Sequence, residues 1–168
     1  MAKKINNTKE TLYGVAKQQF YEFGLKGTTL KSIAEAANVP VTLLTYYFST
    51  KDGLISEIYQ DFYNKISERV QSYENLNINN ALYRSIVISH IYYSIIFSDE
   101  NNKRLYREVR EKNTSFYNLQ GAATDKIYLN YVNDFNLSIS PSQFKFIRVM
   151  TAAARGGFFN YYFENGLE

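Results

Sequence analysis

The sequence of 168 residues contains no cysteine and no tryptophan, and it has a single histidine and two prolines. Without cysteine, neither a disulfide framework nor a thiolate metal site can form, and one histidine excludes a site built from several. No apolar run approaches the ~20 residues that span a bilayer, and the first ten residues lack the apolar core of a signal peptide. We therefore expect a cytoplasmic protein with no metal, no cofactor and no membrane partner.

The chain is rich in aromatic residues, and its charged residues are unevenly distributed. There are 16 tyrosines and 12 phenylalanines, and the net charge is +3. Residues 1–51 carry seven lysines against three glutamates, whereas the remainder carries twelve basic and thirteen acidic side chains. A basic N-terminal third is typical of a DNA-binding head on a body that binds something else. A solvated helical surface with a lysine-rich terminus would give the same charge distribution.

Apolar residues recur at helical rather than strand spacing, which predicts an all-α fold. Gly24 is a C-terminal stop for the first helix, and Ser140 with Pro141 and Gln143 forms a capping box with proline at the first helical position. The expected helices span about 9–23, 29–37, 40–47, 50–73, 82–97, 105–111, 115–135 and 141–163.

Inward faces of two of these helices are assigned from a recurrence of three to four residues. In the helix over 50–73 the face is Leu54, Ile58, Phe62, Ile66 and Val70. In the helix over 82–97 it is Leu82, Ile86, His90, Tyr93 and Phe97.

The stretch from Gly24 to Leu54 contains two short helices joined by a sharp turn. Asn38 lies in this turn, and asparagine tolerates the left-handed backbone that such a corner needs. Two helices joined in this way form a helix-turn-helix, which lays its second helix in the DNA major groove. The apolar faces are Ile33, Ala34 and Ala37 on the first helix and Leu44, Tyr47 and Phe48 on the second.

This stretch resembles the N-terminal signature of the TetR family of bacterial transcriptional regulators. The resemblance implies a helix-turn-helix DNA-binding domain over 1–53, then a helical-bundle ligand-binding and dimerisation domain over 54–168. It ends near Phe62. The matching positions are Ala16, Phe20, Gly24, Thr28, Thr29, Ile33, Ala34, Ala37, Val39, Leu44, Tyr47, Phe48 and 51–54.

The residues expected to contact DNA lie on the outward face of the helix over 40–47 and at the starts of the helices over 29–37 and 50–73. Threonine hydroxyls can bond to base edges or phosphates, and methyl groups can meet thymine methyls. The resemblance implies that Thr28, Thr29 and Lys51 clamp backbone phosphates, as helix N-termini and lysines attract phosphate. For Thr29 a purely structural role as helix cap is the alternative. The full set is Thr28, Thr29, Pro40, Val41, Thr42, Thr45, Tyr46 and Lys51.

Three positions depart from the family pattern. Asn38 replaces the usual glycine of the turn, Pro40 replaces a small hydroxyl residue, and Thr45 replaces a tyrosine that often contacts DNA in the family. Tyr46 could take over that contact. Because the segment has no arginine, we expect operator choice to depend on weaker contacts and on DNA shape.

A second candidate site is an aromatic cavity in the helical body. Small-molecule sites in proteins are usually cavities with a mostly apolar lining and a few polar groups. Arg155 and Tyr128 lie near the expected lining, and an ordinary aromatic core is the alternative for each residue. The ligand-binding set is Phe62, His90, Tyr93, Phe97, Phe116, Gln120, Thr124 and Phe158.

The last helix is expected to form a homodimer seam. Small residues let another helix approach closely, and they cluster here at helical spacing. A close internal packing surface is the alternative. The family closes with two long helices, whereas this chain stops after one, so either the dimer uses fewer helices or a last helix is absent. The seam residues are Val149, Ala153, Gly156 and Asn160.

These patterns favour a regulator that is not an enzyme. We expect a repressor that binds a double-stranded DNA operator as a homodimer and is released by a small apolar or aromatic effector. The alternatives are a small helical enzyme and a regulator whose effector is a protein. The carboxylates available to such an enzyme are Glu108, Glu111, Asp125 and Asp134.

Overall fold

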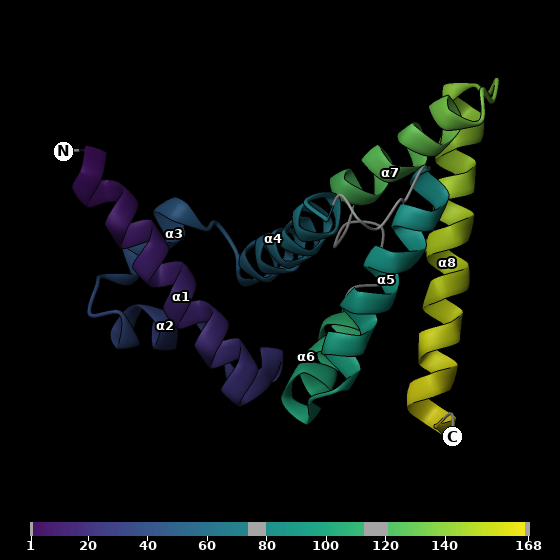
Figure 1. Ribbon diagram of the computed structural model, residues 1–168. Helices are drawn as coiled ribbons and strands as arrows, with labels where there is room; N and C mark the ends of the chain where they lie inside the picture. Colours follow the sequence, from purple (N-terminus) through teal and green to yellow (C-terminus); the bar gives the residue numbers. More distant parts are fainter. Residues whose placement is uncertain (1, 74–79, 113–120, 167–168) are drawn as a thin grey trace. The chain divides into compact units, whose positions relative to one another are not determined.

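The computed structural model describes residues 2–73, 80–112 and 121–166, and every regular element within these ranges is an α-helix (Figure 1). The predicted all-α fold is therefore confirmed. The helices are α1 (Ala2–Gly27), α2 (Leu30–Ala36), α3 (Val41–Tyr47), α4 (Lys51–Gln71), α5 (Ala81–Phe97), α6 (Glu100–Lys112), α7 (Gly121–Asp134) and α8 (Pro141–Asn165). None of them is both long enough and apolar enough to cross a bilayer.

The helices form two compact units. The head unit comprises Met1–Ile58 with Ile95–Lys112, and the body unit comprises Tyr59–Ser94 with Asn113–Glu168. The domain limits predicted from the sequence, 1–53 and 54–168, stay a prediction. In the described structure α6, which that division assigns to the body, packs on α1.

The head unit is built around the N-terminal helices (Figure 1). Leu12, Ala16 and Phe20 of α1 are completely buried. At Gly24 the backbone adopts φ 73° and ψ −179°, so the helical run is kinked where the sequence predicted its end. Asn38 has φ 52°, in the left-handed region expected for the turn between α2 and α3. Local sequence signals therefore determine the corners of this unit.

Aromatic contacts join the helices of the body unit. The Tyr63 and Tyr92 rings connect α4 with α5, with centroids 5.7 Å apart, and the Tyr93 and Phe159 rings connect α5 with α8 at 4.8 Å. The predicted start of α8 is confirmed, because Ser140 and Gln143 form a reciprocal capping box with Pro141 in the first turn.

The inward faces differ from the prediction in α4 and α5. In α5, Leu82, Ile86 and His90 are exposed, whereas Ile88, Tyr92 and Ile96 are buried. The helix is apolar on most sides, so spacing alone did not identify the packed face. In α4 the buried face runs through Leu54, Ile55, Tyr59, Tyr63, Ile66 and Val70. A turn has 3.6 residues, so a face followed in strict steps of four drifts away from the core.

Several helix boundaries also differ from the prediction, and α1 spans Ala2–Gly27 rather than about 9–23. α6 begins at Glu100 rather than near 105, and the Asp99 side chain accepts a hydrogen bond from the Asn102 amide at 2.9 Å. The polar stretch over 98–103, whose composition predicts a break, thus contains the helix cap. For the helix predicted over 115–135, residues 115–120 lie outside the described ranges, and α7 spans Gly121–Asp134.

Candidate nucleic-acid interface and ligand cavity

The outer face of α3 is exposed and its inner face is packed. Leu44 is fully buried and Phe48 nearly so. Tyr46 is 79% exposed and Val41 38% exposed. Pro40, Thr42 and Thr45 are exposed as well, and the Thr45 hydroxyl donates to the Thr42 carbonyl at 3.1 Å. The predicted base-contacting residues therefore share one accessible face.

The two threonines before α2 differ in their placement. Thr29 is exposed and forms a reciprocal capping box with Ser32, so it caps α2, and its contact with phosphate stays a prediction. Thr28 is completely buried, and its hydroxyl donates to the carbonyls of Gln19 and Gly24 at 3.0 and 2.8 Å. The side chain of Thr28 is therefore committed to the interior of the head unit.

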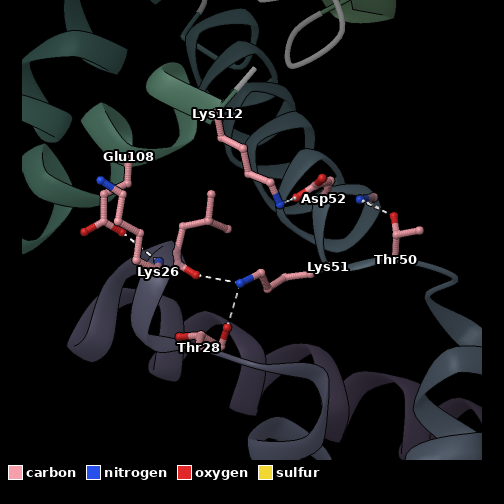
Figure 2. Close-up of polar contacts among 9 residues, drawn as sticks. Lys26, Thr28, Thr50, Lys51, Asp52, Glu108 and Lys112 are labelled. Carbon is pink, nitrogen blue, oxygen red and sulfur yellow. Dashed lines mark hydrogen bonds and ion pairs between the residues drawn. The ribbon is translucent and has the colours of Figure 1, made fainter. Parts of the chain in front are cut away.

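Lys51 is placed by hydrogen bonds to the main chain. Its ammonium donates to the carbonyls of Leu25 and Thr28, both at 2.8 Å (Figure 2). The Thr50 hydroxyl accepts from the Gly53 amide at 2.9 Å and caps α4 (Figure 2). In this structure the ammonium of Lys51 thus joins the start of α4 to the segment that leads into α2.

Sequence reasoning missed the contribution of α6 to this region. Where α1 is broken at Gly24, Arg104 donates to the carbonyls of Tyr21 and Glu22 at 3.0 and 2.9 Å. Glu108 accepts from the Lys26 amide at 2.9 Å (Figure 2). The Arg104 cation therefore binds carbonyls at the end of the helical segment before Gly24, and the Glu108 carboxylate binds an amide just after the break. The i, i+4 spacing of Arg104 and Glu108 places them on one face of α6, but it does not identify their partners on α1.

The body unit contains a cavity of about 330 Å³ between its helices. Its described lining comes from α4, α5, α7 and α8 and includes five tyrosines and one arginine. The lining residues are Tyr63, Ala81, Leu82, Ser85, Ser89, Tyr92, Tyr93, Thr124, Ile127, Tyr128, Tyr131 and Arg155. This volume lies at the lower end of the range typical of small-molecule sites, ~300–1,000 Å³.

The structure brings only some of the predicted ligand residues to this cavity. Tyr93 and Thr124 line it, together with Tyr128 and Arg155. Phe62 packs against the Tyr92 ring at 5.1 Å instead, and Phe97 belongs to the head unit, where it meets Tyr106. His90 is exposed and Phe158 is 53% exposed. Phe116 and Gln120 lie outside the described residues.

The predicted seam residues lie along α8. Val149, Ala153 and Asn160 are exposed, and Gly156 is half-buried. Large apolar neighbours on the same helix are also accessible, among them Phe146 and Met150. α8 therefore presents an apolar surface next to its small residues.

A family model described as bacterial regulatory proteins, tetR family, matches residues 2–58. The chain is 28% identical over 107 residues to the Probable HTH-type transcriptional regulator YttP of Bacillus subtilis (strain 168). That match covers 61% of this chain and 51% of the relative. Over 34 residues it is 50% identical to the HTH-type transcriptional regulator BetI of Burkholderia thailandensis, covering 20% of this chain and 17% of BetI. The chain thus spans about half the length of the first relative and less of the second.

A solved structure from Pseudomonas aeruginosa PAO1 aligns over 94% of this chain and 79% of its own, at 14% identity and a TM-score of 0.39. Similarity of this size carries no structural argument. The match over residues 2–58 coincides with the region that contains the helix-turn-helix, α2 and α3.

Proposed function

We propose that the chain is a sequence-specific DNA-binding transcriptional regulator of the tetR family, because its residues 2–58 match the model of that family. The observation that carries this proposal is α3, whose inner face is buried while Val41, Thr42 and Tyr46 form an accessible outer face. A helix held rigidly from one side and exposed on the other has the form required to enter a major groove.

We further propose that the regulator is a homodimeric repressor. A dimer would set its two α3 helices about one DNA turn apart, ~34–36 Å. The exposed apolar surface of α8, with Ala153 and Gly156, supports a seam between two copies. A ligand bound in the body cavity would favour a different head spacing, and operator affinity would fall by the differential binding energy.

Gel-shift titration with DNA from upstream of the protein's own gene tests the DNA-binding proposal. We expect sequence-dependent binding at moderate salt. Thr42→Ala and Tyr46→Ala should each reduce discrimination between operator and unrelated DNA by ~1–3 kcal/mol for a good base contact. Tyr83→Ala, an exposed tyrosine of α5, is the matched control and should leave discrimination unchanged. Equal affinity for all sequences would refute the proposal.

The dimer is tested by sedimentation of Gly156→Leu against the parent. Leucine would overpack a close helix contact, costing ~1–3 kcal/mol, and should weaken both dimerisation and operator binding without touching the head unit. A variant as dimeric as the parent would place the seam elsewhere.

The alternative of a helical enzyme is weakened by the engagement of its candidate carboxylates. Glu108 accepts from the Lys26 amide, and Glu111 pairs with the Lys26 ammonium at 2.8 Å. Asp125 pairs with Arg148 at 2.6 Å, and Asp134 accepts from the Ala81 amide at 2.7 Å. The four carboxylates therefore bind helix ends and cations. The body cavity favours a small effector over a protein effector.

A further inference from the structure

Gln19 of α1 connects that helix directly to the first turn of α2. Its side-chain amide donates to the Ser32 carbonyl at 3.0 Å, and its amide oxygen accepts from the Ser32 hydroxyl at 2.7 Å. Both residues are half-buried, and they lie 13 positions apart in the sequence. A single side chain of α1 therefore holds a single residue of the neighbouring helix by two hydrogen bonds.

The chemistry of Ser32 fixes the orientation of this amide. A main-chain carbonyl oxygen accepts hydrogen bonds and cannot donate them, so the NH2 group of Gln19 has to face it. The oxygen of the Gln19 amide then faces the Ser32 hydroxyl, which can donate. A side chain that lacks either half of the amide therefore loses at least one of the two bonds.

Ser32 also closes the cap of α2. Its amide donates to the Thr29 hydroxyl at 2.9 Å, and its hydroxyl accepts from the Thr29 amide at 3.1 Å. The main-chain carbonyl of Gln19 in turn accepts from the Thr28 hydroxyl at 3.0 Å. Gln19 thus contacts the first turn of α2 through its side chain and the residue before the cap through its main chain.

The contacts of Lys51 and Glu108 at this corner are of a different kind, because they bind main-chain groups that precede α2. They hold the segment that leads into the helix. α2 itself has seven residues, of which Ile33 and Ala34 are buried. Apolar contacts tolerate adjustment, whereas hydrogen bonds fix direction and distance. The two bonds from Gln19 therefore constrain the direction of α2 more closely than its small apolar face does.

We propose that Gln19 is a positioning residue for DNA binding, which sets the direction of α2 where this helix crosses the phosphate backbone. This inference rests on the proposed function, because the first helix of a helix-turn-helix crosses the backbone while the second enters the major groove. Contacts to phosphate carry no sequence information. A displaced α2 should therefore weaken binding to every DNA sequence by a similar factor, unlike a changed base contact on α3.

The test measures the affinity of Gln19→Met for DNA from upstream of the protein's own gene and for unrelated DNA, at a temperature where each variant is folded. Methionine has a similar length, but it cannot donate and its sulfur accepts only weakly. Both affinities should fall about 5- to 30-fold, the equivalent of one or two net hydrogen bonds, and their ratio should stay unchanged. Gln18→Met is the matched control and should change neither affinity, because the exposed Gln18 side chain binds Glu22 of its own helix at 3.0 Å.

Gln19→Glu provides a second variant that keeps the size and polarity of the side chain. Its carboxylate can still accept from the Ser32 hydroxyl, but it sets an oxygen against the Ser32 carbonyl. Binding to both DNAs should weaken by more than in Gln18→Glu, which adds the same negative charge one position away. Equal losses in these two variants would overturn the proposal.

Melting temperatures separate positioning from a purely structural role. A contact that only stabilises the fold would lower the melting temperature of Gln19→Met and leave the DNA affinity of the folded protein equal to that of Gln18→Met, which would overturn the proposal. If the parent binds DNA without sequence preference and Gln19→Met weakens that binding, the regulator proposal fails while the role of Gln19 stands. If the parent prefers its operator and neither Gln19 variant weakens binding, this inference fails alone. A parent with no affinity for DNA would overturn both.

Discussion

In the head unit, charged and polar side chains meet main-chain groups far away in sequence, whereas in the body unit the helices meet through aromatic rings. Lys51, Arg104 and Glu108 each bind carbonyls or amides next to the break in α1. In the body unit the corresponding links are ring contacts such as Tyr63 with Tyr92. Hydrogen bonds fix direction and distance, while apolar contacts tolerate adjustment.

This difference matches the two kinds of partner that we propose. The major groove of B-DNA is ~12 Å wide and admits one helix, so we expect the segment leading into α2 and α3 to be held at one geometry. A small ligand can be accommodated by side chains that repack around a cavity. The head unit therefore depends on individual polar contacts, and the body unit depends on buried apolar area. Substitutions in the two units test that contrast, and their expected effects range from several kcal/mol to a small shift in one pKa.

The largest effect is expected in the apolar packing of α5. Ile88 is completely buried, whereas Ile86 on the same helix is 55% exposed. Ile88→Ala should reduce the free energy of unfolding by ~2–5 kcal/mol, through lost transfer energy and a new cavity. Ile86→Ala makes the same chemical change at the surface and should cost less than about 1 kcal/mol. Urea denaturation measures both, and equal losses would show that the packed face of α5 is wrongly assigned.

The next effect concerns the polar contacts of the head unit. Lys51→Met keeps much of the aliphatic stem but leaves the carbonyls of Leu25 and Thr28 without their ammonium donor. An orphaned, partly buried carbonyl costs ~1–3 kcal/mol, so the free energy of unfolding should fall by that order. Lys31→Met is the control, because the Lys31 side chain is 77% exposed. A stability loss no greater than that of the control would contradict this role.

The same pair of variants separates stability from DNA binding. If Lys51 also clamps a phosphate, Lys51→Met should weaken binding about equally on all sequences. The slope of log affinity against log salt should then fall by about one. A lost operator preference with retained non-specific binding would argue against the clamp.

A smaller effect is expected at the kink of α1. Gly24 has φ 73°, and an added Cβ would lie 2.6 Å from the Glu108 carboxylate. Gly24→Ala should therefore cost ~1–3 kcal/mol for a combination of φ and ψ that is essentially limited to glycine, plus the cost of displacing Glu108. Gly14→Ala is the control, because a Cβ added at Gly14 would meet nothing within 4 Å, and helix propensity should make it stabilising by up to ~1 kcal/mol. Thermal unfolding distinguishes the two signs.

The glycines and caps show what local sequence can predict. Gly24, Thr29, Asn38 and Ser140 each impose a backbone geometry on their own neighbours, and each lies at the predicted corner or cap. The buried face of α3 was also predicted, because the helical spacing of Leu44 and Phe48 places them on one side. Signals confined to a few adjacent residues can be interpreted without a tertiary structure.

Contacts between distant helices could not be predicted in this way. Arg104 and Glu108 resembled ordinary surface charges of a helix, because nothing nearby in sequence reveals that they bind the ends of α1. Of the predicted ligand residues, Tyr93 and Thr124 line the cavity, whereas His90 and Phe158 are exposed. Where a helix is apolar nearly all round, periodicity indicates that the helix packs but not which side faces the cavity.

The smallest expected effect is a shift in the titration of Asp99. Its pKa lies below the ordinary 3.8 because its carboxylate accepts first from the Asn102 amide and secondarily from the Tyr21 hydroxyl at 3.0 Å. The stability contributed by this carboxylate is therefore present above pH ~4 and is lost as the pH falls through the lowered pKa. Tyr21→Phe removes only the secondary donor, so the pKa should rise slightly and remain below 3.8. NMR titration of the Asp99 carboxyl carbon measures this shift, with Tyr83→Phe as the control on an exposed tyrosine. A pKa that returns fully to its ordinary value in Tyr21→Phe would assign the effect to the phenol rather than to the α6 cap.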